Sequence, residues 1–133
     1  MKFMLDTNTC IYLIKKKPAE VIGHFKRHKV GDIGISSITL AELQCGVEKS
    51  HHVHRNRVAL EEFIAPLEIA PFDEAASRTY GEIRSHLEKA GTPIGSMDTL
   101  IGAHALSLGV TIVTNNIREF NRINNLKVID WTV

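Results

Sequence analysis

The chain has 133 residues, a length that predicts a single domain over residues 1–133 with one sizeable core. Hydrophobic residues make up 44% and charged residues 23%, which is typical of a globular protein, and no apolar stretch approaches the roughly 18 residues of a membrane span. The formal net charge of +1 neither requires nor excludes nucleic acid as a partner, so any such contact depends on local basic patches.

The first half of the chain predicts strands that alternate with helices. The run KFML at 2–5 is continuously apolar, as expected for a strand covered on both faces. In chain order we expect a strand at 2–5, a helix from 7 that ends before Pro18, a helix through 21–25, a strand at 32–36, a helix at 36–48, a polar break at 49–57 and a helix through 60–67.

The second half continues the alternation. We expect a strand at 67–72, a long helix capped by Asp73 and closed by Gly91, a loop at 91–97, a helix that Asp98 opens and Gly109 closes, and strands at 110–114 and 127–130. Strands alternating with helices predict an α/β fold in which a parallel sheet carries helices on both faces. In such sheets, ligands bind beyond the carboxyl ends of the strands.

Four acidic residues fall at or near these predicted ends. Asp6 directly follows the first strand, Glu42 lies early in the helix after the second, and Glu119 follows the fourth, whereas Asp98 begins a helix at either edge of the sheet. Each has a structural explanation: Asp6 and Asp98 suit helix N-termini, Thr39 and Glu42 have capping-box spacing, and Glu119 suits a solvated surface.

As a group, the same acids suggest a metal site. Two carboxylates about 4 Å apart repel each other by roughly 4 kcal/mol at an effective dielectric constant of 20, so a cluster of four needs a cation to stay charged. Oxygen ligands select Mg²⁺ or Mn²⁺ over zinc. A bound Mg²⁺ can activate water for attack on a phosphodiester.

The chain resembles the PIN-domain ribonucleases, specifically the VapC toxins of VapBC type II toxin–antitoxin systems. The resemblance rests on MLDTN at 4–8, SSITLAEL at 36–43, GTPIGSMDTLIGAHAL at 91–106, TNNIREF at 114–120 and IDW at 129–131, and it runs over essentially the whole chain. It implies a three-layer α/β/α sandwich on a parallel five-stranded sheet. It also implies an acidic pocket that binds Mg²⁺ or Mn²⁺ and cleaves RNA, with tRNA among the expected substrates.

Carried over by motif, Asp6, Glu42 and Asp98 are the three core acids of the implied site. Asp6 and Asp98 are expected to bind the metal directly, and Glu42 through a water or at a second metal. Many relatives have an aspartate where this chain has Asn116, which orients water but adds no charge. Glu119 is the alternative fourth residue, so both are retained as catalytic candidates.

The resemblance further implies a cytoplasmic hydrolase that is inhibited by a cognate antitoxin protein and forms a homodimer. Asp6 and Asn8 interrupt the first apolar run before it could serve as a signal peptide, and two cysteines suit a reducing compartment. The surplus of apolar residues on the first helix suits either core packing or a partner. We expect metal-activated water to attack the RNA phosphodiester in line, leaving a 5′-phosphate and a 3′-hydroxyl.

Two alternatives remain open at this point. A haloacid-dehalogenase-type phosphohydrolase also begins with a strand and an aspartate, but it needs a second aspartate where this chain has Asn8. A non-catalytic RNA-binding module on the same fold is the other. Three basic stretches, at 15–17, 26–29 and 49–57, are candidates for RNA contact or plain solvated helix ends. Cys10, Cys45 and His104 are interpreted as packing residues.

Overall fold

The computed structural model describes all residues, 1–133, as five short strands and seven α-helices with one 3₁₀ turn. In chain order the elements are β1 (Phe3–Leu5), α1 (Thr7–Lys15), α2 (Ala19–Arg27), η1 (Val30–Asp32), β2 (Ile33–Ser36), α3 (Ser37–Lys49), α4 (Val53–Ile64), β3 (Glu68–Ala70), α5 (Glu74–Lys89), α6 (Ser96–Leu108), β4 (Thr111–Val113), α7 (Ile117–Phe120) and β5 (Val128–Ile129).

The strands form one parallel sheet in the order β3-β2-β1-β4-β5. β1 lies at the centre, with Met4 opposite Gly34 on one side and Ile112 on the other. Its position explains why 2–5 is apolar throughout, because both faces of a central parallel strand are covered. The predicted parallel five-stranded sheet is therefore confirmed.

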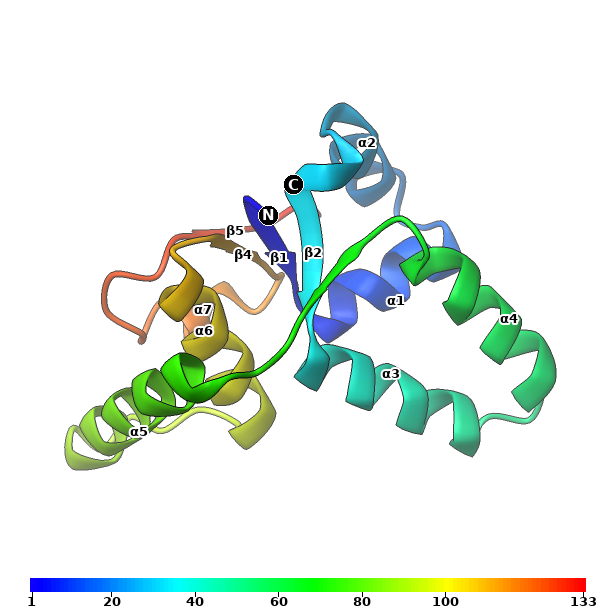
Figure 1. Ribbon diagram of the computed structural model, residues 1–133. Helices are drawn as coiled ribbons and strands as arrows, with labels where there is room; N and C mark the ends of the chain where they lie inside the picture. The colour runs from blue at the N-terminus through cyan, green and yellow to red at the C-terminus, as the bar shows by residue number, and fades with distance from the viewer.

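Two apolar cores lie on opposite faces of this sheet, so the molecule has three layers (Figure 1). Leu5 belongs to the core packed under α1, α2, α3 and α4, and its neighbour Met4 belongs to the core under α5, α6 and α7. Successive residues of a strand point to opposite faces, so β1 contributes to both cores. The α/β/α sandwich that the resemblance implied is present.

Most predicted elements are present within a few residues, but the short helix α7 was not predicted and two helix starts differ. The polar segment 49–57 is only partly a break, because α4 already begins at Val53. The helix expected to open at Asp98 begins at Ser96 after an uncapped Gly95. In both places the first turn of the helix is mostly polar, so apolar periodicity gives little signal there.

Candidate active site

Asp6 lies where β1 passes into α1, at the carboxyl edge of the sheet. It is the N-cap of α1: its Oδ1 accepts a hydrogen bond of 2.8 Å from the Thr9 backbone N–H. The Thr9 hydroxyl in turn donates to the carbonyl of Val113, the last residue of β4, over 3.2 Å. Only 4% of Asp6 is exposed. The capping interpretation is correct but incomplete, since a cap does not require a buried carboxylate.

Glu42 faces the start of α1 across the same edge. Its Oε1 accepts a 2.5 Å hydrogen bond from the Thr7 hydroxyl. The capping-box explanation for Glu42 is wrong, because Ser36 is the N-cap of α3 and accepts from the Ile38 N–H. Thr39 is instead buried, and its hydroxyl has no hydrogen-bond partner. Glu42 therefore lies in the second turn of α3 and does not cap the helix.

Asn116 joins the remaining acids. Its side-chain amide donates to Asp98 Oδ2 over 3.2 Å and to Glu119 Oε2 over 2.9 Å, while its backbone N–H donates to the Thr114 hydroxyl. Asp98 in the first turn of α6 therefore lies at the same sheet edge as the end of β4. The sequence did not predict which edge of the sheet Asp98 occupies. In the structure, both Asn116 and Glu119 lie close to it.

The four carboxylates influence one another electrostatically. Burial raises the pKa of Asp6, the Glu42 charge adds to this rise, and hydrogen bonds from Thr114 and Thr9 oppose it. Burial also raises the pKa of Asp98, and the charges of Asp6, Glu119 and Glu42 push it in the same direction, while the Asn116 hydrogen bond lowers it. The acids therefore form one cluster whose shared negative charge is costly.

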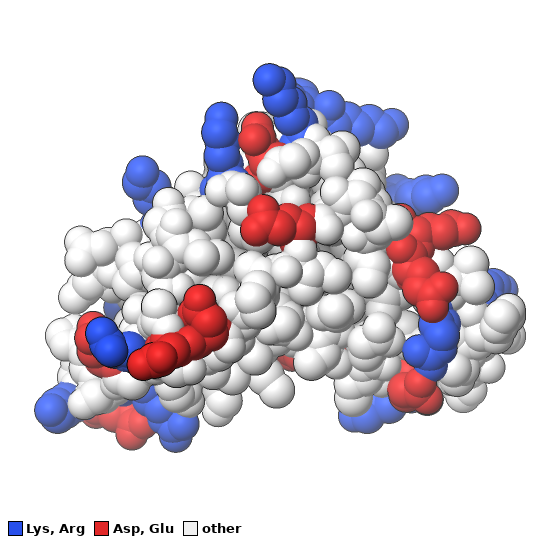
Figure 2. Space-filling view, in the orientation of Figure 1, with Lys and Arg blue, Asp and Glu red and all other residues white.

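No protein cation neutralises this cluster. The chain's four ion pairs all lie elsewhere and involve Glu68, Asp32, Glu48 and Glu88. In Figure 2, Lys and Arg side chains gather at the top of the view, over α2, whereas its lower edge is hollowed between α5 and α3. The stretch at 26–29 precedes β2, so it lies at the opposite edge of the sheet from the acids.

The donor set fits a hydrated divalent cation rather than a fully enclosed one. No three His, Cys, Asp or Glu side chains are arranged closely enough to surround one ion by themselves. Mg²⁺ usually binds one or two carboxylates and retains several waters, so it does not need such an enclosure.

His104 and Ser36 form a buried polar pair behind α3 that the sequence did not predict. His104 Nδ1 lies 2.8 Å from the Ser36 hydroxyl, and the His104 ring is 1% exposed. Burial lowers the pKa of His104, which favours the neutral ring. A neutral Nδ1 that accepts from Ser36 leaves the Ser36 oxygen free to accept from Ile38, and this contact holds the N-terminus of the helix that carries Glu42.

A groove of about 400 Å³ extends from the site between α1, α3 and α4. Thr7 and Glu42 line one part of it, and Ile11, Ile14 and Val47 line its apolar part. The surplus apolar residues of α1 are therefore divided: Leu13 is buried in the core, whereas Ile11 and Ile14 face this groove. Of the two cysteines expected to be buried, Cys10 is buried and Cys45 is exposed.

Comparison with known proteins identifies the family. The PIN domain family model matches residues 3–126. The chain belongs to the PIN-domain family. Nucleases of this family generally depend on a divalent metal. Membership also sets aside the haloacid-dehalogenase interpretation.

This PIN domain is similar over nearly its whole length to proteins named VapC. It is 46% identical over 132 residues to the tRNA(fMet)-specific endonuclease VapC of Shigella flexneri, covering 99% of each chain. It is 47% identical over 131 residues to the Salmonella typhimurium protein of the same name, covering 98% of each. These relatives are named as endonucleases, in agreement with the nuclease chemistry inferred from the acids.

Solved structures extend the similarity. The DNA-bound VapBC of Salmonella typhimurium contains a chain with a TM-score of 0.93 and 46% identity, with 98% of each chain covered. VapBC2 of Rickettsia felis, bound to a promoter DNA fragment, gives 0.89 and 44%, covering 98% of this PIN domain and 99% of that chain. Both are toxin–antitoxin assemblies. No helix of this PIN domain is long and apolar enough to cross a membrane.

Proposed function

We propose that this PIN domain is a divalent-metal-dependent endoribonuclease and the toxin of a toxin–antitoxin pair. One observation carries the proposal: Asp6, Glu42, Asp98 and Glu119 gather at one sheet edge with no protein cation among them. Burial and mutual repulsion make such a cluster costly unless it serves to bind a cation.

Mg²⁺ is the proposed metal, with Mn²⁺ able to substitute, since both prefer oxygen ligands. Asp6 and Asp98 are its proposed direct ligands, and Glu42 acts through water. When bound, the metal lowers the pKa of a water molecule and neutralises charge on the scissile phosphate. Thr7 orients Glu42 through its hydroxyl.

The fourth site position is shared by two residues in this proposal. The Asn116 amide donates to both Asp98 and Glu119. It therefore fixes Asp98 in place and holds Glu119 beside it, so that the fourth negative charge comes from Glu119. Asn116 is therefore a positioning residue. Many relatives have an aspartate at the position of Asn116, and in this chain Glu119 supplies the carboxylate instead.

RNA is the proposed substrate, and tRNA the proposed class, because the two relatives at 46–47% identity are named tRNA(fMet)-specific endonucleases. Identity of this extent over the full chain supports a shared substrate class.

An antitoxin chain is the proposed protein partner. The groove that runs from Ile11 and Ile14 to Glu42 suits an apolar helix followed by a cationic side chain. We also propose that two copies of this chain pair as a homodimer.

The decisive experiment uses two aspartates with the same local task. Asp73 is the N-cap of α5 and accepts from the Ala76 N–H over 3.0 Å, as Asp6 does from Thr9 over 2.8 Å. Asparagine caps helices as well as aspartate does. Asp6→Asn and Asp73→Asn therefore each remove one negative charge while keeping the helix cap. With Mg²⁺ and purified tRNA, Asp6→Asn is expected to lose about 100-fold or more of the cleavage rate.

The control for this experiment is the Asp73→Asn variant. Asp73→Asn is expected to cleave tRNA at a rate within about twofold of the unmodified protein, because surface substitutions rarely matter. EDTA is expected to abolish cleavage in both proteins. Equal cleavage by Asp6→Asn and Asp73→Asn, or full cleavage in EDTA, would refute metal-dependent cleavage at Asp6. Absence of cleavage by the unmodified protein would instead favour a non-catalytic RNA-binding module.

A further inference from the structure

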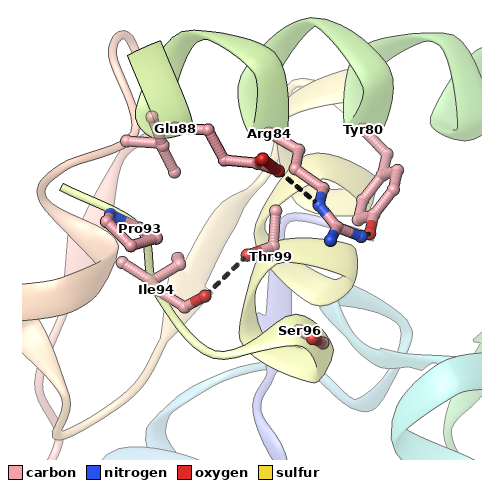
Figure 3. Close-up of a pocket in the computed structure, with 8 residues that line it drawn as sticks. Tyr80, Arg84, Glu88, Pro93, Ile94, Ser96 and Thr99 are labelled. Carbon is pink, nitrogen blue, oxygen red and sulfur yellow. Dashed lines mark hydrogen bonds and ion pairs between the residues drawn. The ribbon is translucent and has the colours of Figure 1, made fainter. Parts of the chain in front are cut away.

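A second cavity, of about 270 Å³, lies between α5 and the segment that leads into α6, the helix that carries Asp98. Its walls include Tyr80, Arg84, Pro93, Ile94, Ser96 and Thr99. Figure 3 shows Tyr80 and Arg84 pointing from α5 toward the first turn of α6, where Ser96 and Thr99 lie. The cavity is lined by polar and apolar atoms together, unlike the mainly apolar groove beside α1.

The wall on α6 is the same helical turn that carries Asp98. Ser96 is two residues before Asp98 and Thr99 is one residue after it. Asp98 faces Asn116 and the acids, whereas Ser96 and Thr99 face the cavity. An RNA strand whose phosphate lies at the acids therefore meets the helical turn whose other side lines this cavity.

The opposite wall is formed by the Tyr80 ring and the Arg84 guanidinium, here called the platform, which are held together. Arg84 donates to the Tyr80 hydroxyl and to Glu88 Oε1, each over 2.7 Å, and its guanidinium carbon lies 5.9 Å from the centre of the Tyr80 ring. The Arg84 side chain is 55% exposed, so the platform is open to solvent. Aromatic rings and guanidinium planes are the groups on which proteins stack unpaired RNA bases.

The remaining lining atoms suit the edge of a base. The Ser96 hydroxyl has no hydrogen-bond partner within the chain. The Thr99 hydroxyl donates to the Gly95 carbonyl over 2.8 Å and keeps its own oxygen available as an acceptor. Glu88 offsets the charge of Arg84, which disfavours a phosphate in the cavity and favours an uncharged, planar group. The volume lies just below the roughly 300–1,000 Å³ of pockets for drug-sized ligands.

We propose that this cavity binds one unpaired base of the RNA substrate, adjacent to the scissile phosphate. The proposal rests on the endoribonuclease function proposed above and adds a specific subsite to it. Tyr80 and Arg84 bind the base through its face, and Ser96 and Thr99 contact its edge. The subsite thereby restricts cleavage to single-stranded or loop positions, because a base-paired nucleotide cannot turn its base into the cavity.

The test combines protein variants with modified RNA. A single-stranded RNA that the unmodified protein cuts is prepared in versions that each replace one nucleotide beside the cut with an abasic ribose. The variants are Tyr80→Leu, which removes the stacking face, Tyr80→Phe, which keeps it, and Arg84→Ala. Arg78→Ala is the matched control, since Arg78 is an exposed arginine of α5 outside the cavity.

The proposal predicts that one abasic position raises KM for the unmodified protein roughly 5- to 150-fold, the effect of losing one stacked base. Tyr80→Leu is expected to raise KM for intact RNA by a similar factor and to add nothing further on that abasic RNA. Arg84→Ala is expected to raise KM in the same direction. Tyr80→Phe and Arg78→Ala are expected to stay near the unmodified protein, with kcat similar in all.

Three results would overturn the subsite. In the first, the unmodified protein cleaves every abasic RNA as well as intact RNA, a result that does not depend on any variant folding. In the second, the Tyr80→Leu and abasic effects multiply, so the two groups do not touch. In the third, Tyr80→Leu changes the sedimenting mass and leaves KM unchanged, so the cavity is a contact between copies. Absence of any RNA cleavage by the unmodified protein would instead refute the proposed function itself.

Discussion

Asp98 shows at the scale of one residue how a partly buried carboxylate beside other acids affects stability. Burial and the charges of Asp6, Glu119 and Glu42 raise its pKa above the ordinary value of 3.8. A carboxyl group whose pKa is higher in the folded state binds its proton more tightly there. It therefore contributes stability below the unfolded-state pKa, and this contribution is lost as the pH rises through the folded-state pKa.

Asp98→Asn is accordingly expected to stabilise the metal-free protein at neutral pH. At pH 7 in EDTA, its Tm should exceed that of the unmodified protein, because the substitution removes a buried, repelled charge. The difference should shrink as the pH falls toward 3.8, where the native carboxyl group is protonated. Thermal unfolding followed by circular dichroism measures both. A constant difference, or a less stable variant at pH 7, would contradict the electrostatic account.

The same stabilisation should reverse when metal is present. A cation that binds only the folded state stabilises it by an amount that grows with the logarithm of the ratio of its concentration to the dissociation constant, and the unmodified protein alone retains both proposed direct ligands. At the scale of single residues, sequence predicted these acids but not their contacts. The hydrogen bond from Thr7 to Glu42 joins residues 35 apart, and the one between His104 and Ser36 joins residues 68 apart. Local patterns carry no information on such contacts.

At the scale of elements, the close contact between β2 and β3 depends on Gly34. A Cβ atom placed on Gly34 would lie 2.6 Å from the backbone oxygen of Glu68 in β3. A backbone atom in a central sheet cannot move away as a flexible side chain can. The absence of a side chain at Gly34 therefore permits the close approach of β2 to β3.

Gly34→Ala is expected to lower the free energy of unfolding by about 1–3 kcal/mol, the usual cost of overpacking. Gly81→Ala in α5 is the matched control, because a Cβ at Gly81 meets nothing within 4 Å. It should stabilise the protein by roughly 0.5–1 kcal/mol, since alanine favours helix more than glycine does. Urea denaturation measures both. A neutral Gly34→Ala would show that β2 and β3 are less tightly paired than described.

Element boundaries were harder to predict than elements. Ser36, Ser37 and Thr39 can each cap a helix, and sequence could not select Ser36, so Glu42 was assigned to a capping box that does not form. The start of α4 at Val53 was hidden by the polar residues of its first turn. By contrast, the strands were located correctly because each is a short apolar run, and Asp73 and Gly109 marked helix ends as expected.

For the whole molecule, the alternation of strands and helices was sufficient to predict the parallel sheet and its two covered faces. It could not place Asp98 at the carboxyl edge, because a helix start can adjoin either edge of a sheet. It also could not show that the stretch 26–29 lies at the opposite edge from the acids. The distribution of charge is a property of the folded chain: Figure 2 shows a group of Lys and Arg side chains at the top of the view, over α2.

Acids that are distant along the chain are proposed to form one site for a divalent cation. Isothermal titration of the metal-free protein with Mn²⁺ tests it most directly, with Asp6→Asn and Asp73→Asn titrated alongside. The account predicts saturable binding by the unmodified protein and by Asp73→Asn, and binding weakened about 10-fold or more in Asp6→Asn. Equal affinity in all three proteins, or no binding by the unmodified protein, would contradict it.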